Sequence, residues 1–150
     1  MELKTVRKRA EVVFRDDSVL TGHFFVATLS PLHDGSQTMA ELLNGERGFL
    51  PLEIRAGETV LVQKNAIALV RIGERDQIVP AALARSIPVT VCLLSGQSLE
   101  GTVRNDLPSD YSRLSDFFNH SLPFFVLEEP GGDCLVNLDA VRSVRSGAGE

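Results

Sequence analysis

Alternation of apolar and polar residues predicts two β-hairpins in this chain of 150 residues. Over 8–15, apolar residues recur at every second position from Ala10 onward, which is typical of a half-buried strand. A polar turn separates this strand from a second one over 19–27. The same order returns with strands over 89–93 and 98–105. We therefore expect two hairpins of similar design.

A glycine stands at the same place in the second strand of each hairpin. Gly22 interrupts the first return strand and Gly101 the second. Glycine inside a strand often marks a bulge or a sharp bend. The two glycines predict such a bend in each hairpin, which would allow a small sheet to curl.

A longer segment also occurs twice, as QTMAELLNGERGFLPL over 37–52 and as SRLSDFFNHSLPFFVL over 112–127. At a constant shift, residues of like character coincide over the whole segment. The aligned pairs are Met39 with Leu114, Glu41 with Asp116, Leu42-Leu43 with Phe117-Phe118, Asn44 with Asn119, Phe49-Leu50 with Phe124-Phe125, and Leu52-Glu53 with Leu127-Glu128. This correspondence indicates that the chain is a duplication.

The repeated segment begins with the signals of a single helical turn. Ser115 is suited to the N-cap, and Glu41 and Asp116 lie in the first turn, where the helix dipole favours a negative charge. Asn44 and Asn119 are suited to a left-handed C-cap. We expect a helical turn in each half, with the paired apolar residues of that turn closing one end of a small barrel.

Three further short strands follow each helical turn. The pattern places them over 49–54, 60–63 and 66–71 in the first half, and over 124–128, 135–137 and 140–145 in the second. Identical residues occur at Val62 and Val136, Ala66 and Ala140, Val70 and Val144, and Arg71 and Arg145. The predicted fold class is therefore all-β, with two tandem five-stranded barrels over 1–72 and 88–146, a linker over 73–87, in which 81–85 could form a helical turn, and a tail over 147–150.

This arrangement resembles the small barrels of the Sm-like and Src-homology-3-like folds. A strand-turn-strand with LxG, then RxSDFFN, then a strand and VNxDAVxxV, is similar to a bacterial Sm-like domain family of unknown function. Sm-like proteins commonly form rings by pairing the fourth strand of one subunit with the fifth strand of the next, and many bind RNA. The resemblance implies that Asn44 and Asn119 lie nearest to the RNA-contacting position.

Charge and composition modify this expectation. Residues 1–75 contain 10 Lys/Arg and 10 Asp/Glu, whereas residues 76–150 contain 5 and 10. A nucleic-acid binder usually carries a basic face. Basic residues that could contact phosphates beside the two asparagines are Arg47, Lys64 and Arg113. Single-stranded nucleic acid is therefore the alternative partner.

The sequence predicts no catalytic centre, metal site or cofactor. His23, His33 and His120 are not spaced as metal ligands, and phosphate-binding and nucleophile motifs do not occur. Cys92 and Cys134 lie inside apolar runs and are expected to be buried, reduced thiols. The chain contains no apolar run of membrane-spanning length and begins without a signal-peptide pattern, so we expect a cytoplasmic protein without a membrane partner.

These observations favour a non-enzymatic interaction or assembly module. An open small barrel exposes strand edges, which pair with a partner unless charges or prolines block them. The fourth strands carry few such residues, namely Glu58 and Lys64 in the first half and Asp133 in the second. We therefore expect pairing of edges within the chain and between copies, giving a homo-oligomer or a complex with another protein.

Overall fold

The computed structural model confirms the all-β class. It describes residues 5–30, 32, 35–76, 85–107 and 113–146. All ten strands join one antiparallel sheet in the order β10-β6-β7-β8-β9-β5-β1-β2-β3-β4. No helix in these described ranges is long and apolar enough to cross a membrane.

The first five strands form one half of this sheet, which we call the first repeat. Its elements are β1 (Thr5–Phe14), β2 (Val19–Ala27), α1 (Met39–Leu43), β3 (Phe49–Arg55), β4 (Glu58–Gln63), the short helix η1 (Lys64–Ala66) and β5 (Ile67–Arg71). The strand order within this half is β5-β1-β2-β3-β4.

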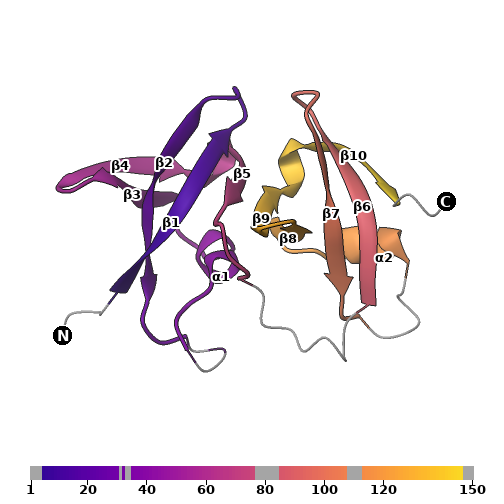
Figure 1. Ribbon diagram of the computed structural model, residues 1–150, viewed down its shortest axis with the longest axis horizontal. Helices are drawn as coiled ribbons and strands as arrows, with labels where there is room; N and C mark the ends of the chain where they lie inside the picture. The colour runs from indigo at the N-terminus through magenta and orange to yellow at the C-terminus, as the bar shows by residue number, and fades with distance from the viewer. Residues whose placement is uncertain (1–4, 31, 33–34, 77–84, 108–112, 147–150) are drawn as a thin grey trace.

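The last five strands form the other half, called the second repeat. Its elements are β6 (Arg85–Leu93), β7 (Ser98–Asn105), α2 (Leu114–Asn119), β8 (Phe124–Glu129), β9 (Gly132–Asn137), the short helix η4 (Leu138–Ala140) and β10 (Val141–Ser146). The strand order is β10-β6-β7-β8-β9, which matches that of the first repeat position by position. Figure 1 shows the two halves side by side, with β5 and β9 at the centre.

The first strand of the second repeat begins earlier than the apolar alternation indicated. β6 begins at Arg85, so the first three residues of this strand lie inside the predicted linker over 73–87. Arg85 pairs with Asn105 at the far end of β7, and this long hairpin extends the strand beyond the apolar alternation. Most of the helical turn predicted over 81–85 lies outside the described ranges. The predicted tail over 147–150 lies wholly outside them.

The two strand glycines serve close approach rather than a bulge. The β1–β2 register runs without a shift through Gly22, and the β6–β7 register does the same through Gly101. A Cβ on Gly22 would collide with the backbone carbonyl of Glu53, and one on Gly101 would lie 2.6 Å from the carbonyl oxygen of Glu128. Glycine at these positions therefore lets the third strand of each repeat lie against the second.

Both helical turns begin with a carboxylate that accepts the N–H of the N-cap residue, and the N-cap of α2 differs from the predicted Ser115. Thr38 is the N-cap of α1, where its hydroxyl accepts the Glu41 N–H at 3.1 Å and the Glu41 carboxylate accepts the Thr38 N–H at 3.0 Å. In α2 the N-cap is Arg113 instead of Ser115, and the Asp116 carboxylate accepts the Arg113 N–H at 3.2 Å. Glu41 and Asp116 thus have equivalent roles.

The predicted left-handed C-caps are absent at both asparagines. Asn44 does end α1, but with φ −93° and ψ 4°. Asn119 is the last residue within α2, whose C-cap is His120. An asparagine after a short apolar helix is compatible with several helix ends, so the sequence could not distinguish them.

Candidate functional site

The junction between the repeats is a strand pairing within the chain. β5 of the first repeat pairs antiparallel with β9 of the second, with Val70 opposite Leu135 and Leu69 opposite Val136. These four side chains are fully buried. The fifth strand of one repeat therefore covers the edge of the fourth strand of the other, so the pairing of edges expected within the chain is present.

Apolar side chains cross this junction in both directions. Phe124 and Leu135 of the second repeat pack into the core of the first, with Ala10, Leu52 and Val70 among its members. In return, Val13 and Leu69 of the first repeat pack into the core of the second. The two repeats consequently complete each other's cores.

Two amide side chains bind the backbone across the junction. Asn44 Nδ2 donates to the carbonyl oxygen of Phe124 at 3.0 Å, and the Phe124 N–H donates to Asn44 Oδ1 at 2.8 Å. Asn137 lies opposite Phe124 in the β8–β9 ladder, and its Nδ2 donates to the carbonyl oxygen of Ile67 at 2.9 Å. Asn44 thus satisfies both backbone groups of the first residue in β8.

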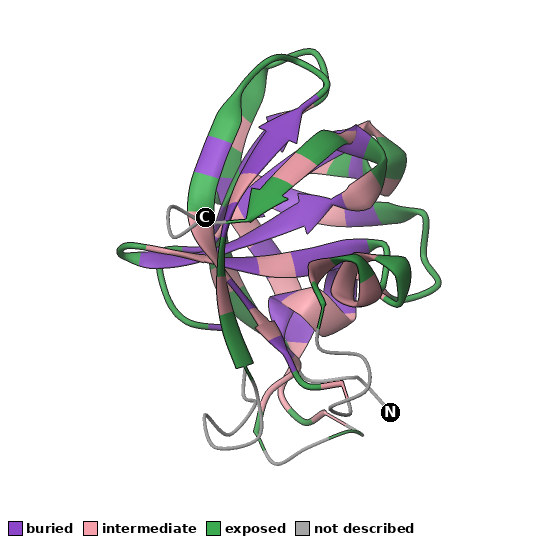
Figure 2. Ribbon diagram, turned by 90° about the vertical axis from the view of Figure 1, so that its right-hand side faces the viewer, coloured by how far each residue is buried: buried purple, intermediate pink, exposed green. Residues whose placement is uncertain are grey.

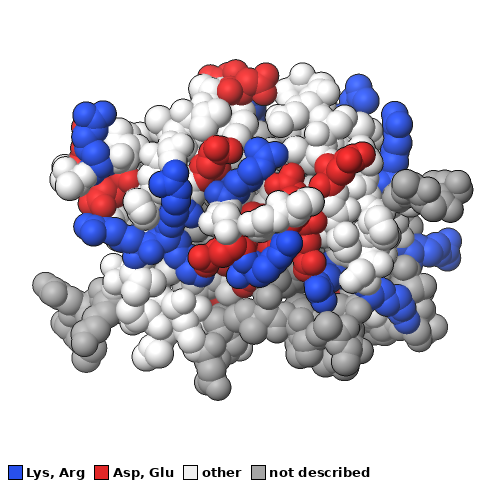
Figure 3. Space-filling view, viewed as in Figure 1, with Lys and Arg blue, Asp and Glu red and all other residues white. Residues whose placement is uncertain are grey.

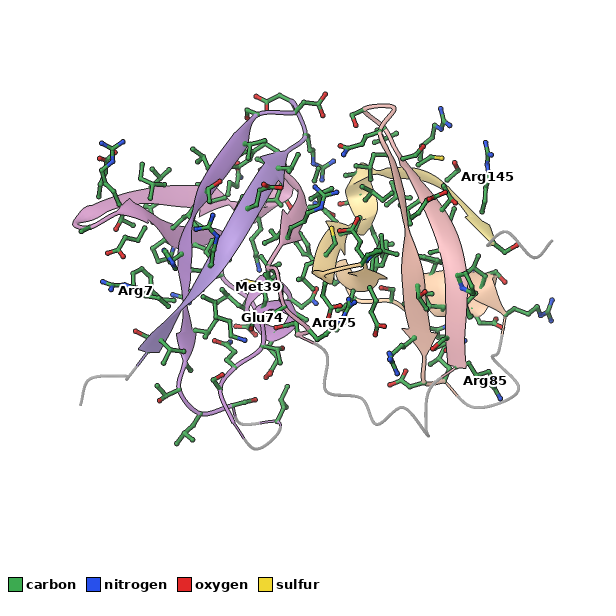
Figure 4. The ribbon with its side chains drawn as sticks, viewed as in Figure 1. Arg7, Met39, Glu74, Arg75, Arg85 and Arg145 are labelled. Carbon is green, nitrogen blue, oxygen red and sulfur yellow. The ribbon has the colours of Figure 1, made fainter. Side chains whose placement is uncertain are left out.

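A buried acidic network fixes the segment that leaves β5. Asp76 accepts the Met39 and Ala40 N–H groups at 2.7 and 2.9 Å, at the start of α1, and its own N–H donates to Asp133 at 2.8 Å. Arg75 pairs with Asp133 at 2.8 Å. Figure 4 shows Arg75, Glu74 and Met39 near one another at this junction. Asp133 is therefore a buried junction residue, whereas the sequence suggested an edge charge.

Burial and neighbouring charges at the junction shift the pKa values of Cys134 and Arg71. Burial raises the pKa of the Cys134 thiol well above its ordinary value, so the thiol stays protonated at neutral pH. Burial alone would lower the pKa of Arg71, but its hydrogen bond with Glu129 and neighbouring negative charges raise it overall. The Arg71 Nε to Glu129 Oε1 distance is 3.1 Å. Both cysteines are free and buried, as predicted.

β4 and β10 stand at the two ends of the sheet, and no strand in the described part of the chain pairs with their outer edges. β9 is buried at all six positions, whereas β4, in the same place within the first repeat, is exposed at four of six. β5 is buried at four of five positions, whereas its equivalent β10 has none fully buried. Figure 1 places β4 and β10 toward opposite ends of the molecule.

The five residues predicted to contact a ligand or RNA are divided between the repeats. Asn44, Arg47 and Lys64 belong to the first repeat, where Lys64 Nζ donates to the carbonyl oxygen of Gly45. Burial, and then the charge of Arg47, lower the pKa of Lys64. Asn119 and Arg113 are exposed at the two ends of α2. The asparagines therefore differ sharply in environment although they occupy equivalent positions of the repeated segment.

A cavity of about 540 Å³ opens between α1 and α2. Apolar side chains such as Phe117, Phe124 and Val126 line most of its wall. Of its acidic groups, Asp76 accepts backbone N–H groups of α1 and Glu41 accepts the Ser30 hydroxyl at 2.7 Å. These polar groups are thus engaged in holding the fold.

Metal ligation and family membership add no further assignment. In the described part of the chain, no three His, Cys, Asp or Glu side chains form a group that could hold a metal ion. Comparison with protein-family models, curated proteins and solved structures finds no match to this chain.

Proposed function

We propose that this chain is a non-enzymatic assembly module, built from two small five-stranded barrels of Sm-like type, whose copies join through their free strand edges. Free edges of this kind offer a row of backbone donors and acceptors to another strand. The proposed partner is a second copy of the same chain, because the chain already makes the required joint once, between β5 and β9.

The observation that carries the proposal is the exposure of two apolar residues beside the free edge of the first repeat. Phe49 and Leu61 are 54% and 66% exposed. Their repeat equivalents, Phe124 and Leu135, are 5% and 0% exposed because they insert into the core of the neighbouring repeat. Phe49 and Leu61 are therefore suited to insert into the neighbouring copy in the same way.

The second repeat carries aromatic side chains on α2 that are not fully covered, and one of them, Phe117, also lines the cavity between α1 and α2. Phe117 and Phe118 of α2 are only partly buried and pack edge-to-face with each other and with Phe125. Their equivalents in α1, Leu42 and Leu43, are buried. Figure 1 shows α2 on the side of the second repeat away from the first. Figure 2 views this end of the molecule and shows exposed residues within β10.

By the same equivalence, β10 of one copy pairs with β4 of the next. The register places Val144 opposite Leu61, as Val70 lies opposite Leu135 within the chain. A joint between two different surfaces is head-to-tail, and it produces a closed ring or an open filament according to the rotation per step.

Light scattering after size exclusion tests self-association. We expect the wild-type mass to exceed 16.4 kDa and to rise with concentration. Leu61→Lys puts a charge at the centre of the β4 edge and should leave a monomer. Leu29→Lys is the matched control, because Leu29 is 78% exposed and lies outside the strands of both edges. A wild-type monomer at high micromolar concentration contradicts the proposal.

Complementation tests the head-to-tail direction. Leu61→Lys blocks β4 only, and Val144→Lys blocks β10 only. Each variant alone should be monomeric. A joint needs a working β10 and a working β4, and every copy of a given variant lacks the same one of the two. An equimolar mixture should form a dimer, joining β10 of the first variant to β4 of the second. Recovery of binding also shows that both variants fold, and a mixture of monomers contradicts this direction.

The alternative of single-stranded nucleic-acid binding has less support. The amide of Asn44 is bonded to Phe124, and Lys64 is bonded to Gly45. Figure 3 shows Lys and Arg interspersed with Asp and Glu over the face in view. Titration of labelled single-stranded RNA at low salt, where electrostatic affinity is greatest, measures this alternative directly.

A further inference from the structure

A comparison of the two asparagines suggests a specific contact between copies. Asn44 and Asn119 align in the duplication, and Phe49 and Phe124 align at the same shift. Within the chain, Asn44 makes two hydrogen bonds to the backbone of Phe124. Asn119 is exposed, and the structure describes no hydrogen bond to its side-chain amide.

The backbone of Phe49 is oriented to receive such an amide. In the first repeat, the Lys64 N–H donates to the carbonyl oxygen of Gly48 at 2.9 Å, and in the second the Leu138 N–H donates to that of Pro123 at 2.8 Å. The β3–β4 and β8–β9 ladders therefore form their hydrogen bonds at equivalent residues. Because successive backbone groups of a strand alternate in direction, the N–H and C=O of Phe49 point away from β4, as those of Phe124 point away from β9.

We infer that the Asn119 side chain clamps the backbone of Phe49 in the neighbouring copy, with its Oδ1 accepting the Phe49 N–H and its Nδ2 donating to the Phe49 carbonyl. This inference rests on the proposed head-to-tail assembly and assigns a positioning residue to it. The copy that supplies β10 also supplies Asn119, just as the repeat that supplies β5 supplies Asn44.

The clamp would set the register of the joint. A sliding β10–β4 ladder could pair in several registers, since backbone groups repeat along a strand. An amide that binds both groups of one residue distinguishes that residue from its neighbours. Asn119 would thus favour the register in which Val144 faces Leu61.

The directed heterodimer of Leu61→Lys and Val144→Lys provides the test. Only the Leu61→Lys copy uses its α2 at the joint, so Asn119→Ala in that copy should raise the dissociation constant about tenfold, as expected for two lost hydrogen bonds. The same substitution in the Val144→Lys copy should leave the constant unchanged. Sedimentation velocity measures both mixtures, and thermal melting should show no loss of fold in either.

Each outcome bears on a different claim. A heterodimer that forms with the same affinity whichever copy carries Asn119→Ala overturns the clamp and leaves the head-to-tail assembly standing. Equal weakening from both copies also overturns it, because an effect through folding does not depend on which α2 meets the joint. Failure of the parent heterodimer to form contradicts the proposed assembly itself and removes the clamp with it.

Discussion

The two repeats share a strand order but differ in what covers them. α1 buries Met39, Leu42 and Leu43 and contacts β8 of the other repeat, whereas α2 has no fully buried residue. The same contrast holds between β9 and β4 and between β5 and β10. In each pair, the buried member is the one at the junction. Burial in this molecule is therefore decided by the neighbouring repeat as much as by the sequence of the element.

The largest expected effect separates a covered leucine from its exposed equivalent. Leu135→Ala should destabilise the fold by about 2–5 kcal/mol, because it leaves a cavity in a closed core. Leu61→Ala should change stability by no more than about 0.5 kcal/mol. Urea unfolding at low micromolar concentration measures both without a contribution from association. Similar losses in the two variants would contradict the asymmetry of the edges.

Substitutions of the two strand glycines test a feature that the repeats share, the close approach of the third strand to the second. Gly22→Ala and Gly101→Ala should each cost about 3 kcal/mol, because the added Cβ meets the backbone carbonyl of Glu53 or Glu128. Differential scanning calorimetry can compare the two melting temperatures with wild type. A neutral result at either glycine would show that the third strand can move away from the second there.

The asparagine pair gives a smaller difference in stability. Asn44→Ala should cost about 2 kcal/mol, because it leaves the buried N–H and C=O of Phe124 without partners. Asn119→Ala should be nearly neutral in the dilute monomer, because Asn119 is exposed and is not the C-cap of α2. Chemical denaturation of the two variants side by side is the measurement. A loss at Asn119 as large as that at Asn44 would restore a structural role for it.

The smallest expected effect is a difference in thiol reactivity between the two cysteines. Hydrogen bonds from Ser98 and then Ser143 lower the pKa of the Cys92 thiol, whereas burial raises that of Cys134. Since the thiolate is the nucleophile, iodoacetamide at mildly alkaline pH should label Cys92 first. Peptide mass spectrometry gives the order. Earlier labelling of Cys134 would mean that the junction opens more readily than the free end.

Much of the fold could be predicted from the sequence. Hairpins and helical turns depend on residues close together in the chain, and the duplication is visible when the two halves are aligned. The pairing of β5 with β9 was expected only as edge pairing in general, since alternation along a strand does not identify its neighbour. Asp76 lay in what looked like a linker, and its bonds to Met39 and Ala40 depend on distant chain segments meeting. Asn44 and Asn119 have the same motif, so only the assembled sheet distinguishes them.

The ion pairs of the internal junction have no counterpart at the free edges. Asp133 aligns with Thr59 and Glu129 with Ile54, so the ion pairs made with Arg75 and Arg71 would not form between copies. Asn137 aligns with Gln63, which keeps an amide at that position. The joint between copies should accordingly be apolar and amide-based, and weaker than the internal one.

The β5–β9 ladder also constrains the stoichiometry of the proposed assembly. Since that ladder lies within one polypeptide, it loses no translational freedom when it forms and persists at any dilution. Barrels would enter an assembly two at a time, so their total is even. Dilution should then separate the assembly into single chains, with every second joint intact.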